Sequence, residues 1–216
     1  MNTKDRLALF PHRFVPRAPN GPTLALLLLH GTGGNEDDLL PLGKLLAPGA
    51  ALLSPRGRVL ENGMPRFFRR FAEGVLDVED LKLRAKELAE FVRAARAEYG
   101  LIDPPLYAVG FSNGANIAAG LLLVEPELLD GAALLRAMVP FEPDAPPALQ
   151  GKRVLLAAGR RDPYSGPEQT ERLRAILEGG GAEVTVHWSE VGHALIQDDV
   201  DATAAWISRA RPGGGS

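Results

Sequence analysis

The sequence has no cysteine among its 216 residues. Disulfides, a thiol nucleophile and a zinc site with cysteine ligands are therefore excluded. Long hydrophobic runs are also missing, because the longest, Leu24–Leu29, is far shorter than the roughly 20 residues of a transmembrane helix. Neither sign of charge dominates, since 24 basic and 27 acidic residues give a net charge of −3. No basic patch indicates binding to nucleic acid.

The N-terminal 17 residues lack the uninterrupted apolar segment of a secretory signal. We therefore expect a cytoplasmic protein without a membrane span, whose partner is a small molecule. The length suits one large α/β domain, which we assign to residues 1–211. We interpret the glycine-rich residues 212–216 as a flexible tail or a cloning scar.

Short apolar runs, typical of buried strands, alternate along the chain with longer segments of helical periodicity. The expected strands are Leu24–Leu29, Ala50–Leu53, Leu106–Val109, Ala132–Leu135, Val154–Ala158 and Val184–Trp188. The expected helices are Glu36–Leu46, Val78–Tyr99, Asn113–Val124, Pro167–Glu178 and Gln197–Arg209. This alternation predicts an α/β fold, with a mostly parallel central sheet and helices on both faces. Ligands of such sheets bind beyond the carboxyl ends of the strands.

The pentapeptide at residues 110–114, Gly-Phe-Ser-Asn-Gly, joins an expected strand to an expected helix. A serine at such a sharp strand-to-helix turn is typical of a nucleophile elbow. The two glycines are needed because side chains two residues before and after the serine would collide. We therefore predict that Ser112 is a nucleophile, the alternative being a glycine-rich turn with a solvated serine.

A serine hydroxyl needs a base to remove its proton as it attacks, and the chain has four histidines. His12 lies in the polar N-terminal arm, His30 precedes a glycine-rich loop, and His187 lies in a strand pattern. His193 follows the last expected strand and precedes the last helix. It is therefore the best placed base, although a solvated or helix-capping histidine would also fit that position.

The base in turn needs a carboxylate that fixes its tautomer. Asp162 follows the expected strand Val154–Ala158, again at a carboxyl end. The chain order Ser112, Asp162, His193 is the order found in α/β-hydrolases. Asp162 could instead cap the helix that begins near Pro167 or pair with a neighbouring arginine.

Attack on an acyl carbonyl also requires donors for the oxyanion that forms. The amide of Asn113, directly after the serine, is one candidate. The second is Thr32, in the loop His30-Gly-Thr-Gly-Gly34 after the first long apolar run. This loop lacks the spacing and lysine of a P-loop and the third glycine of a dinucleotide fingerprint. We therefore expect neither a cofactor nor a metal, and a structural role for His30.

Two segments, residues 55–77 and 139–150, interrupt the alternation, and each follows a strand end. Long connections at that edge of a sheet commonly build a binding site, although both could be ordinary surface loops. The first mixes arginines with aromatic residues, but it is too short, on a surface that is not otherwise basic, to favour RNA. We choose the pocket residues for their apolar character: Met64, Phe67, Phe68 and Phe141.

At these residues the chain resembles the carboxylesterase and phospholipase branch of the α/β-hydrolase superfamily. This branch includes acyl-protein thioesterases and bacterial carboxylesterases of the hydroquinone-resistance hydrolase type. The resemblance spans nearly the whole chain and is carried by LLHGTGGNEDDLLPL from Leu28, SPRGRVLENGMPRFFRRFAEGVLDVEDL from Ser54, GFSNGANIA from Gly110, GRRDPYSGPEQTERL from Gly159 and VGHALIQDDV from Val191. The long segment from Ser54 is most similar to the bacterial subgroup.

The resemblance implies an α/β-hydrolase core without a large separate lid domain, and often a homodimer. It also implies the triad Ser112, Asp162 and His193, with oxyanion donors at Thr32 and Asn113. The implied reaction is hydrolysis of carboxylic esters with short or medium acyl chains. The chain departs from the family pattern at three pocket positions: Ala137, Tyr164 and Ser165.

Other functions fit the same residues. Thioesters or lysophospholipids could be the substrates, whereas a dienelactone-type reaction usually uses a cysteine, which is missing here. A non-catalytic α/β-hydrolase that binds a ligand is the alternative from another class.

Overall fold

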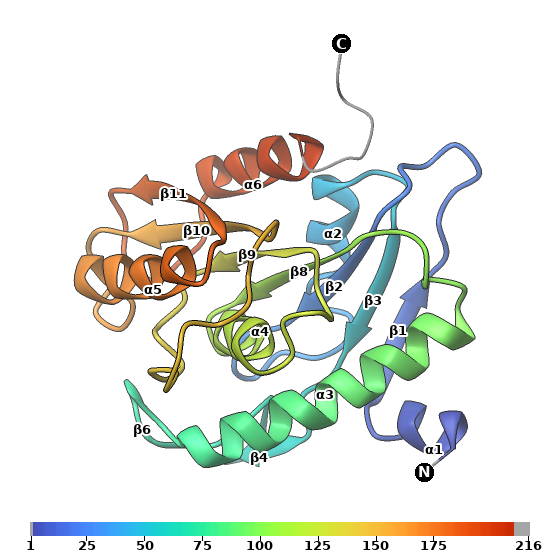
Figure 1. Cartoon of the computed structure of the whole chain (residues 1–216), viewed down its shortest axis with the longest axis horizontal. Coiled ribbons are helices and arrows are strands. Elements are labelled where there is room, and N and C mark those ends of the chain that lie inside the picture. Colours follow the sequence, from blue (N-terminus) through green and yellow to red (C-terminus); the bar gives the residue numbers. More distant parts are fainter. Residues whose placement is uncertain (1, 210–216) are drawn as a thin grey trace.

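A seven-stranded sheet runs through the centre of the molecule in the order β1-β3-β2-β8-β9-β10-β11 (Figure 1). The computed structural model describes residues 2–209, so the tail expected at 212–216 lies outside the described residues. Neighbouring strands are parallel, except that β1 pairs antiparallel with β3. The strands are β1 (His12–Val15), β2 (Ala25–Leu29), β3 (Ala51–Pro55), β8 (Leu106–Phe111), β9 (Gly131–Leu135), β10 (Arg153–Gly159) and β11 (Glu183–Ser189).

Helices cover both faces of this sheet. On one face lie α3, α4 and α5, with α1 packed against α3, and on the other face lie α2 and α6. The helices are α1 (Thr3–Leu7), α2 (Leu40–Leu46), α3 (Val78–Glu98), α4 (Asn113–Val124), α5 (Pro167–Gly179) and α6 (Gln197–Arg209). The expected α/β-hydrolase architecture, with a mostly parallel sheet, is confirmed, and residues 2–209 contain no large separate lid domain.

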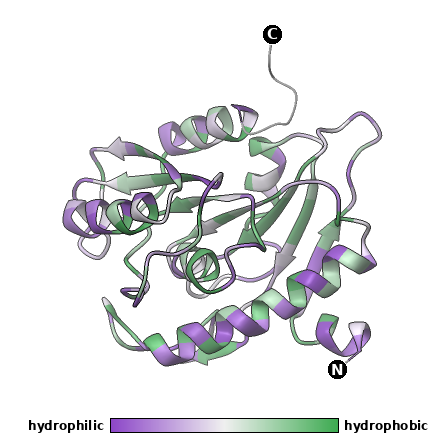
Figure 2. Cartoon of the chain, viewed as in Figure 1, coloured by the Kyte–Doolittle hydropathy of each residue, from purple (hydrophilic) through white to green (hydrophobic). Residues whose placement is uncertain are grey.

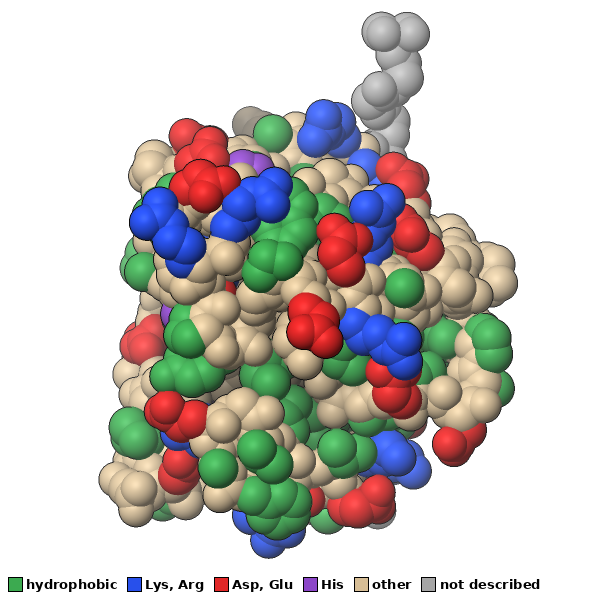
Figure 3. Space-filling model, turned by 90° about the vertical axis from the view of Figure 1, so that its left-hand side faces the viewer, with side chains coloured by type: hydrophobic (Ala, Val, Ile, Leu, Met, Phe, Trp, Pro, Cys, Tyr) green, Lys and Arg blue, Asp and Glu red, His purple; other side chains and the backbone are tan. Residues whose placement is uncertain are grey.

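Alternate residues of each central strand enter two separate cores. In β2, Ala25, Leu27 and Leu29 pack toward α3 and α4, whereas Leu26 and Leu28 pack toward α2 and α6. Because both faces are covered, the strand consists of consecutive apolar residues. Figure 2 shows hydrophobic strands inside and helices with hydrophilic outer faces. On the face drawn in Figure 3, acidic and basic side chains are interspersed. No helix in the described part of the chain has both the length and the apolar character to span a bilayer.

The structure differs from the predicted elements in three places. The helix expected from Glu36 begins at Leu40, because the preceding residues form turns and Pro41 occupies the first helical turn. The polar N-terminal arm, for which no element was predicted, contains α1 and the edge strand β1. The segment 55–77 forms two hairpins, from β4 (Val59–Glu61) and β5 (Met64–Arg66), and from β6 (Arg70–Ala72) and β7 (Val75–Leu76).

Candidate active site

Ser112 lies at the tip of the turn between β8 and α4, with φ 52° and ψ −113°. Positive φ is uncommon for a residue other than glycine and indicates a strained turn. A Cβ on Gly110 would lie 2.3 Å from the Gly114 carbonyl oxygen, and one on Gly114 would lie 1.9 Å from the Leu29 carbonyl oxygen. The turn can therefore close only if both positions are glycine.

The structure brings Ser112, His193 and Asp162 together at the carboxyl ends of the strands. His193 Nε2 lies 2.8 Å from Ser112 Oγ, and His193 Nδ1 lies 2.7 Å from Asp162 Oδ2. The carboxylate can only accept, so Nδ1 carries the proton and Nε2 is free to accept one from the serine. The aromatic rings of Phe111 and Tyr164 restrict the imidazole of His193, because their centroids lie 5.5 and 5.4 Å from its centroid.

Asp162 is buried and surrounded by donors. Its Oδ1 accepts the amides of Tyr164 and Ser165 at 2.9 and 3.1 Å, and its Oδ2 accepts the Ser165 hydroxyl at 2.7 Å. Burial by itself would raise the pKa of Asp162, but the hydrogen bonds from Ser165, Tyr164 and His193 outweigh it, so the pKa is lowered. The carboxylate therefore stays ionised beside the imidazole.

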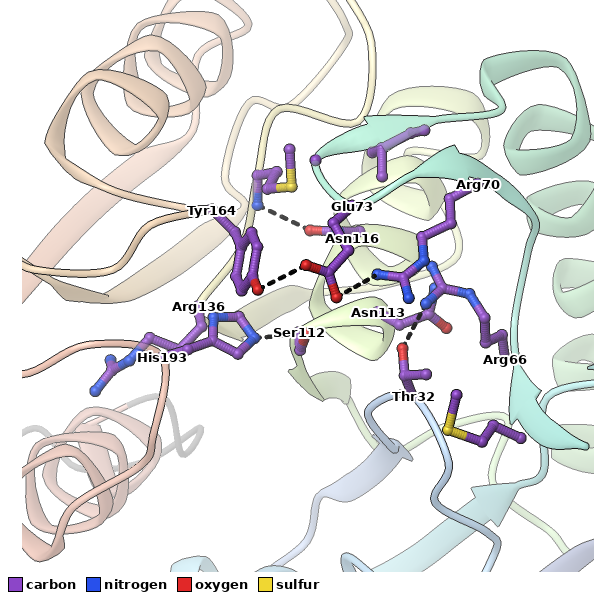
Figure 4. A pocket seen from close by; sticks show the side chains of 14 residues that line it. Thr32, Arg66, Arg70, Glu73, Ser112, Asn113, Asn116, Arg136, Tyr164 and His193 are labelled. Carbon is purple, nitrogen blue, oxygen red and sulfur yellow. Dashed lines mark hydrogen bonds and ion pairs between the residues drawn. The ribbon is translucent and has the colours of Figure 1, made fainter. Parts of the chain in front are cut away.

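Thr32 and Asn113 line the same pocket as Ser112 (Figure 4). Within residues 2–209, neither backbone amide donates a hydrogen bond to another protein group. For Asn113 this follows from its position, since the first amides of a helix have no intrahelical acceptor. Both amides are thus available to a ligand in the pocket.

Three consecutive residues after the β4-β5 turn hold the segments that carry these amides. The Pro65 carbonyl oxygen accepts the Gly33 amide at 2.9 Å. The Arg66 guanidinium donates to Thr32 Oγ1 at 2.6 Å, and the Phe67 amide donates to Asn113 Oδ1 at 2.8 Å. We name residues 65–67 the brace, because they join the loop after β2 to the start of α4.

His30 takes part in this framework and not in the triad. Its Nδ1 donates to the Gly31 carbonyl oxygen at 2.7 Å, and its Nε2 accepts the Gly57 amide at 2.9 Å. These partners require the neutral imidazole. Burial agrees with this state, because it lowers the pKa of His30. The side chain therefore has the structural position expected from the sequence.

Glu36 and Arg56 form a second link between the loop after β2 and the segment after β3. Their two hydrogen bonds measure 2.5 and 2.7 Å. The hydrogen bonds from Arg56 lower the pKa of Glu36 from 4.5 to about 2, despite the opposing effect of burial. Because the pKa is lower in the folded state, the pair stabilises the fold fully above pH 4.5, and this contribution disappears as the pH falls toward about 2.

We therefore expect Glu36→Gln to lower the urea midpoint of unfolding at neutral pH. The difference from the wild type should shrink as the pH falls through the range between the two pKa values, 4.5 and about 2. Urea titrations of both proteins, at neutral pH and near the lower end of that pH range, measure this difference in midpoint. A difference that does not change with pH would contradict the assignment.

The pocket above Ser112 has a volume of about 290 Å³. Polar and charged side chains form much of its wall, in addition to Met64, Leu76 and Met138. The polar and charged residues are Thr32, Arg66, Arg70, Glu73, Ser112, Asn113, Asn116, Arg136, Tyr164 and His193. The structure describes no group of three or more His, Cys, Asp or Glu side chains that could hold a metal ion.

Of the four predicted pocket residues, only Met64 lines this cavity. Phe67 and Phe68 are 2% and 0% exposed and belong to the hydrophobic core. Phe141 lies in another surface depression, against Lys82. The prediction was wrong for these three because it used apolar character as the criterion, whereas burying two adjacent phenylalanines stabilises the fold. The arginines beside them, visible in the sequence, line the pocket instead.

Arg136 is a residue that the sequence analysis did not single out. It follows β9 with φ 60°, and its side chain is fully buried. The guanidinium contacts Asp199 at 2.5 Å and donates to the carbonyl oxygens of Gly192 and Ala194 at 3.2 and 2.9 Å. These carbonyls flank His193, so the ion pair holds the histidine loop against α6.

The parallel sheet, the serine at a strained turn and the serine-histidine-aspartate arrangement define an α/β-hydrolase. No protein-family model matches the sequence. A curated relative from Bacillus subtilis, named "Putative hydrolase MhqD", is 46% identical over 185 residues, which cover 86% of this chain and 92% of the relative. The chain belongs to the phospholipase/carboxylesterase family of α/β-hydrolases, and it is a hydrolytic enzyme.

Solved structures agree with this assignment. The Bacillus cereus carboxylesterase is 45% identical, with a TM-score of 0.90, over 97% of this chain and all of that one. A carboxylesterase from Mesorhizobium loti is 32% identical, with a TM-score of 0.82, over 92% and 94% of the two chains. YahD, solved with malic acid, is 28% identical, with a TM-score of 0.85, over 94% of this chain and all of that one.

Proposed function

We propose that the protein is a serine carboxylesterase that hydrolyses short- to medium-chain carboxylic esters through an acyl-enzyme. The observation that carries this proposal is the hydrogen-bonded series from Ser112 Oγ through His193 to Asp162 Oδ2, beneath an open pocket. The names of the Bacillus cereus and Mesorhizobium loti relatives support ester cleavage.

In the proposed mechanism, Ser112 Oγ attacks the ester carbonyl carbon while His193 Nε2 accepts the hydroxyl proton. Asp162 keeps the imidazole in the required tautomer and stabilises the imidazolium. The amides of Thr32 and Asn113, whose segments the brace holds in place, donate to the oxyanion. His193 then returns the proton to the departing alcohol, and a water molecule hydrolyses the acyl-serine by the same steps.

The size of the pocket supports short acyl groups. A volume of about 290 Å³ lies just below the range of most small-molecule sites, roughly 300–1,000 Å³. Long acyl chains, as in lysophospholipids, would extend beyond it. Because YahD was solved with malic acid, the esters used to test the proposal should include those of small dicarboxylic acids.

A fluorophosphonate probe tests the proposal against a non-catalytic, ligand-binding protein. We expect the wild type to form a covalent adduct at Ser112, because the probe reacts only with an activated serine. Ser112→Ala should remain unlabelled, and intact-protein mass spectrometry with peptide mapping measures both results. As a matched control, replacing the exposed Ser208 of α6 by alanine should leave labelling unchanged. A wild-type protein that forms no adduct would contradict the proposed function.

The homodimer and the cytoplasmic location expected from the sequence stay predictions, and thioesters stay the alternative substrates.

A further inference from the structure

One wall of the pocket carries two guanidinium groups; that of Arg66 also belongs to the brace, whereas that of Arg70 has no part in the proposed ester cleavage. Arg66 and Arg70 both line the cavity, and their side chains are 3% and 21% exposed. A buried cation is unfavourable unless nearby groups compensate for its lost hydration. The contacts of these two arginines therefore indicate what the wall can bind.

The two guanidinium groups share one firmly held carboxylate, that of Glu61. Arg70 Nε donates to both oxygens of Glu61, at 3.0 and 3.1 Å, and Arg66 Nε lies 3.1 Å from Glu61 Oε2. The hydrogen bonds from Arg70 lower the pKa of Glu61, so this carboxylate is ionised. Glu61 neutralises one of the two positive charges of Arg66 and Arg70. The partner of the other positive charge is Glu73.

Glu73 is a weak partner. Its carboxylate lies 4.0 Å from Arg70, and its side chain is 64% exposed at the tip of the β6-β7 hairpin. Although Arg70 is mostly buried, Glu73 reaches it from the solvent side at the limit of ion-pair distance, where water screens the contact and it contributes little. The ion pair itself therefore does little to keep the carboxylate of Glu73 beside Arg70.

The position of Glu73 also shows that a carboxylate fits in this part of the pocket. Figure 4 shows Glu73 lying between Arg70 and Tyr164, and the Tyr164 hydroxyl donates to Glu73 Oε2 at 2.9 Å. Tyr164 comes from the loop after β10, and its ring stands edge-on to that of His193. A cation and a hydroxyl donor thus hold a carboxylate from two sides, close to the triad.

A further donor in the wall has no partner. Asn113 is 2% exposed, and its Oδ1 accepts the Phe67 amide. Its Nδ2 has no hydrogen-bond acceptor among the described residues. Buried donors are almost always satisfied, so this one favours a ligand that brings an acceptor into the cavity.

We propose that this wall binds the free carboxylate of a dicarboxylic acid monoester, which makes the preferred substrate an anionic ester with a short acyl chain. The inference rests on the proposed esterase function and names its substrate class. Arg70 and the Tyr164 hydroxyl bind the free carboxylate in place of Glu73, whose side chain turns to solvent. The ester carbonyl lies at Ser112, and hydrolysis releases an alcohol and the dicarboxylate.

The test compares two esters of equal acyl chain length, monoethyl glutarate and ethyl pentanoate, by their kcat/KM values. Charge-assisted hydrogen bonds contribute enough to predict a wild-type preference of about tenfold or more for the monoester. Arg70→Gln should reduce this ratio by about tenfold, and Glu73→Gln should raise it, because a competing carboxylate is lost. Arg172→Gln removes an exposed arginine on α5 and should leave the ratio unchanged. Circular dichroism checks the fold of each variant.

The outcomes separate this inference from the proposed function. If the wild type cleaves ethyl pentanoate but shows no preference for monoethyl glutarate, the anionic subsite is wrong and the esterase stands. If neither ester is cleaved, titration calorimetry with glutarate tests the anionic subsite by itself. Binding that Arg70→Gln weakens supports the subsite, whereas no binding, or binding that Arg70→Gln leaves unchanged, overturns it.

Discussion

Ser112→Ala is expected to lower kcat for p-nitrophenyl acetate by about 10⁶-fold, and His193→Ala should cost a similar factor. The reason is that the nucleophile and its base act as a unit, so the loss of either removes the acyl-enzyme route. Asp162→Asn should cost less, about 10⁴-fold, because the base remains but its tautomer is no longer fixed. Steady-state kinetics, with enzyme concentrations fixed by absorbance, measures all three.

The double variant Ser112→Ala/His193→Ala is the critical control. If the two residues act in one step, it should be no slower than either single variant. Additive losses, or a Ser112→Ala enzyme that retains wild-type kcat, would rule out the mechanism. His12 lies at the far edge of the sheet, hydrogen-bonded to Tyr99, and His12→Asn provides a variant for which kcat should not change.

Arg136→Met is expected to lower the free energy of unfolding by about 3–5 kcal/mol, because it leaves the buried carboxylate of Asp199 without its counter-ion. Methionine retains most of the side-chain length, and it faces the same strain at positive φ. The effect should therefore come from the lost charge and hydrogen bonds. Urea unfolding followed by circular dichroism measures it.

Two further variants identify the cause. Arg136→Met/Asp199→Leu removes both charges and should be more stable than Arg136→Met alone. Arg174→Met breaks an exposed pair with Glu178 on α5 and should change the free energy of unfolding by at most about 1 kcal/mol. An Arg136→Met protein as stable as Arg174→Met would show that the buried pair contributes little.

The sequence predicted the sheet and most helices because their apolar patterns are strong. All six expected strands are present, with ends within two residues of those expected. Strand β1 was missed because it is a half-buried edge strand whose four residues show no regular pattern. The hairpins of segment 55–77 were missed because their strands have only two or three residues each, fewer than a periodicity can reveal.

The triad could be predicted from the sequence, because the order of its residues along the chain fixes where they lie. The pocket wall could not, because it depends on the direction of individual side chains. Ser112, Asp162 and His193 each follow a strand, so the parallel sheet brings them to one edge. The pocket wall depends on which of the adjacent residues Arg66 and Phe67 turns inward. The phenylalanine packs in the core and the arginine reaches Thr32. No local pattern distinguishes these two directions, because the segment has no long periodic element.

The brace also separates the parts of the pocket that can be redesigned from those that cannot. The tip of the β6-β7 hairpin, Glu73-Gly74, lines the pocket outside the brace; Glu73 is exposed, whereas Gly74 has φ 75° and should stay glycine. Residues 65–67 are fixed by their bonds to the two amide-bearing segments. Libraries that vary the residues of this tip other than Gly74 can therefore change which acids the enzyme accepts, while the residues that cleave the ester stay the same.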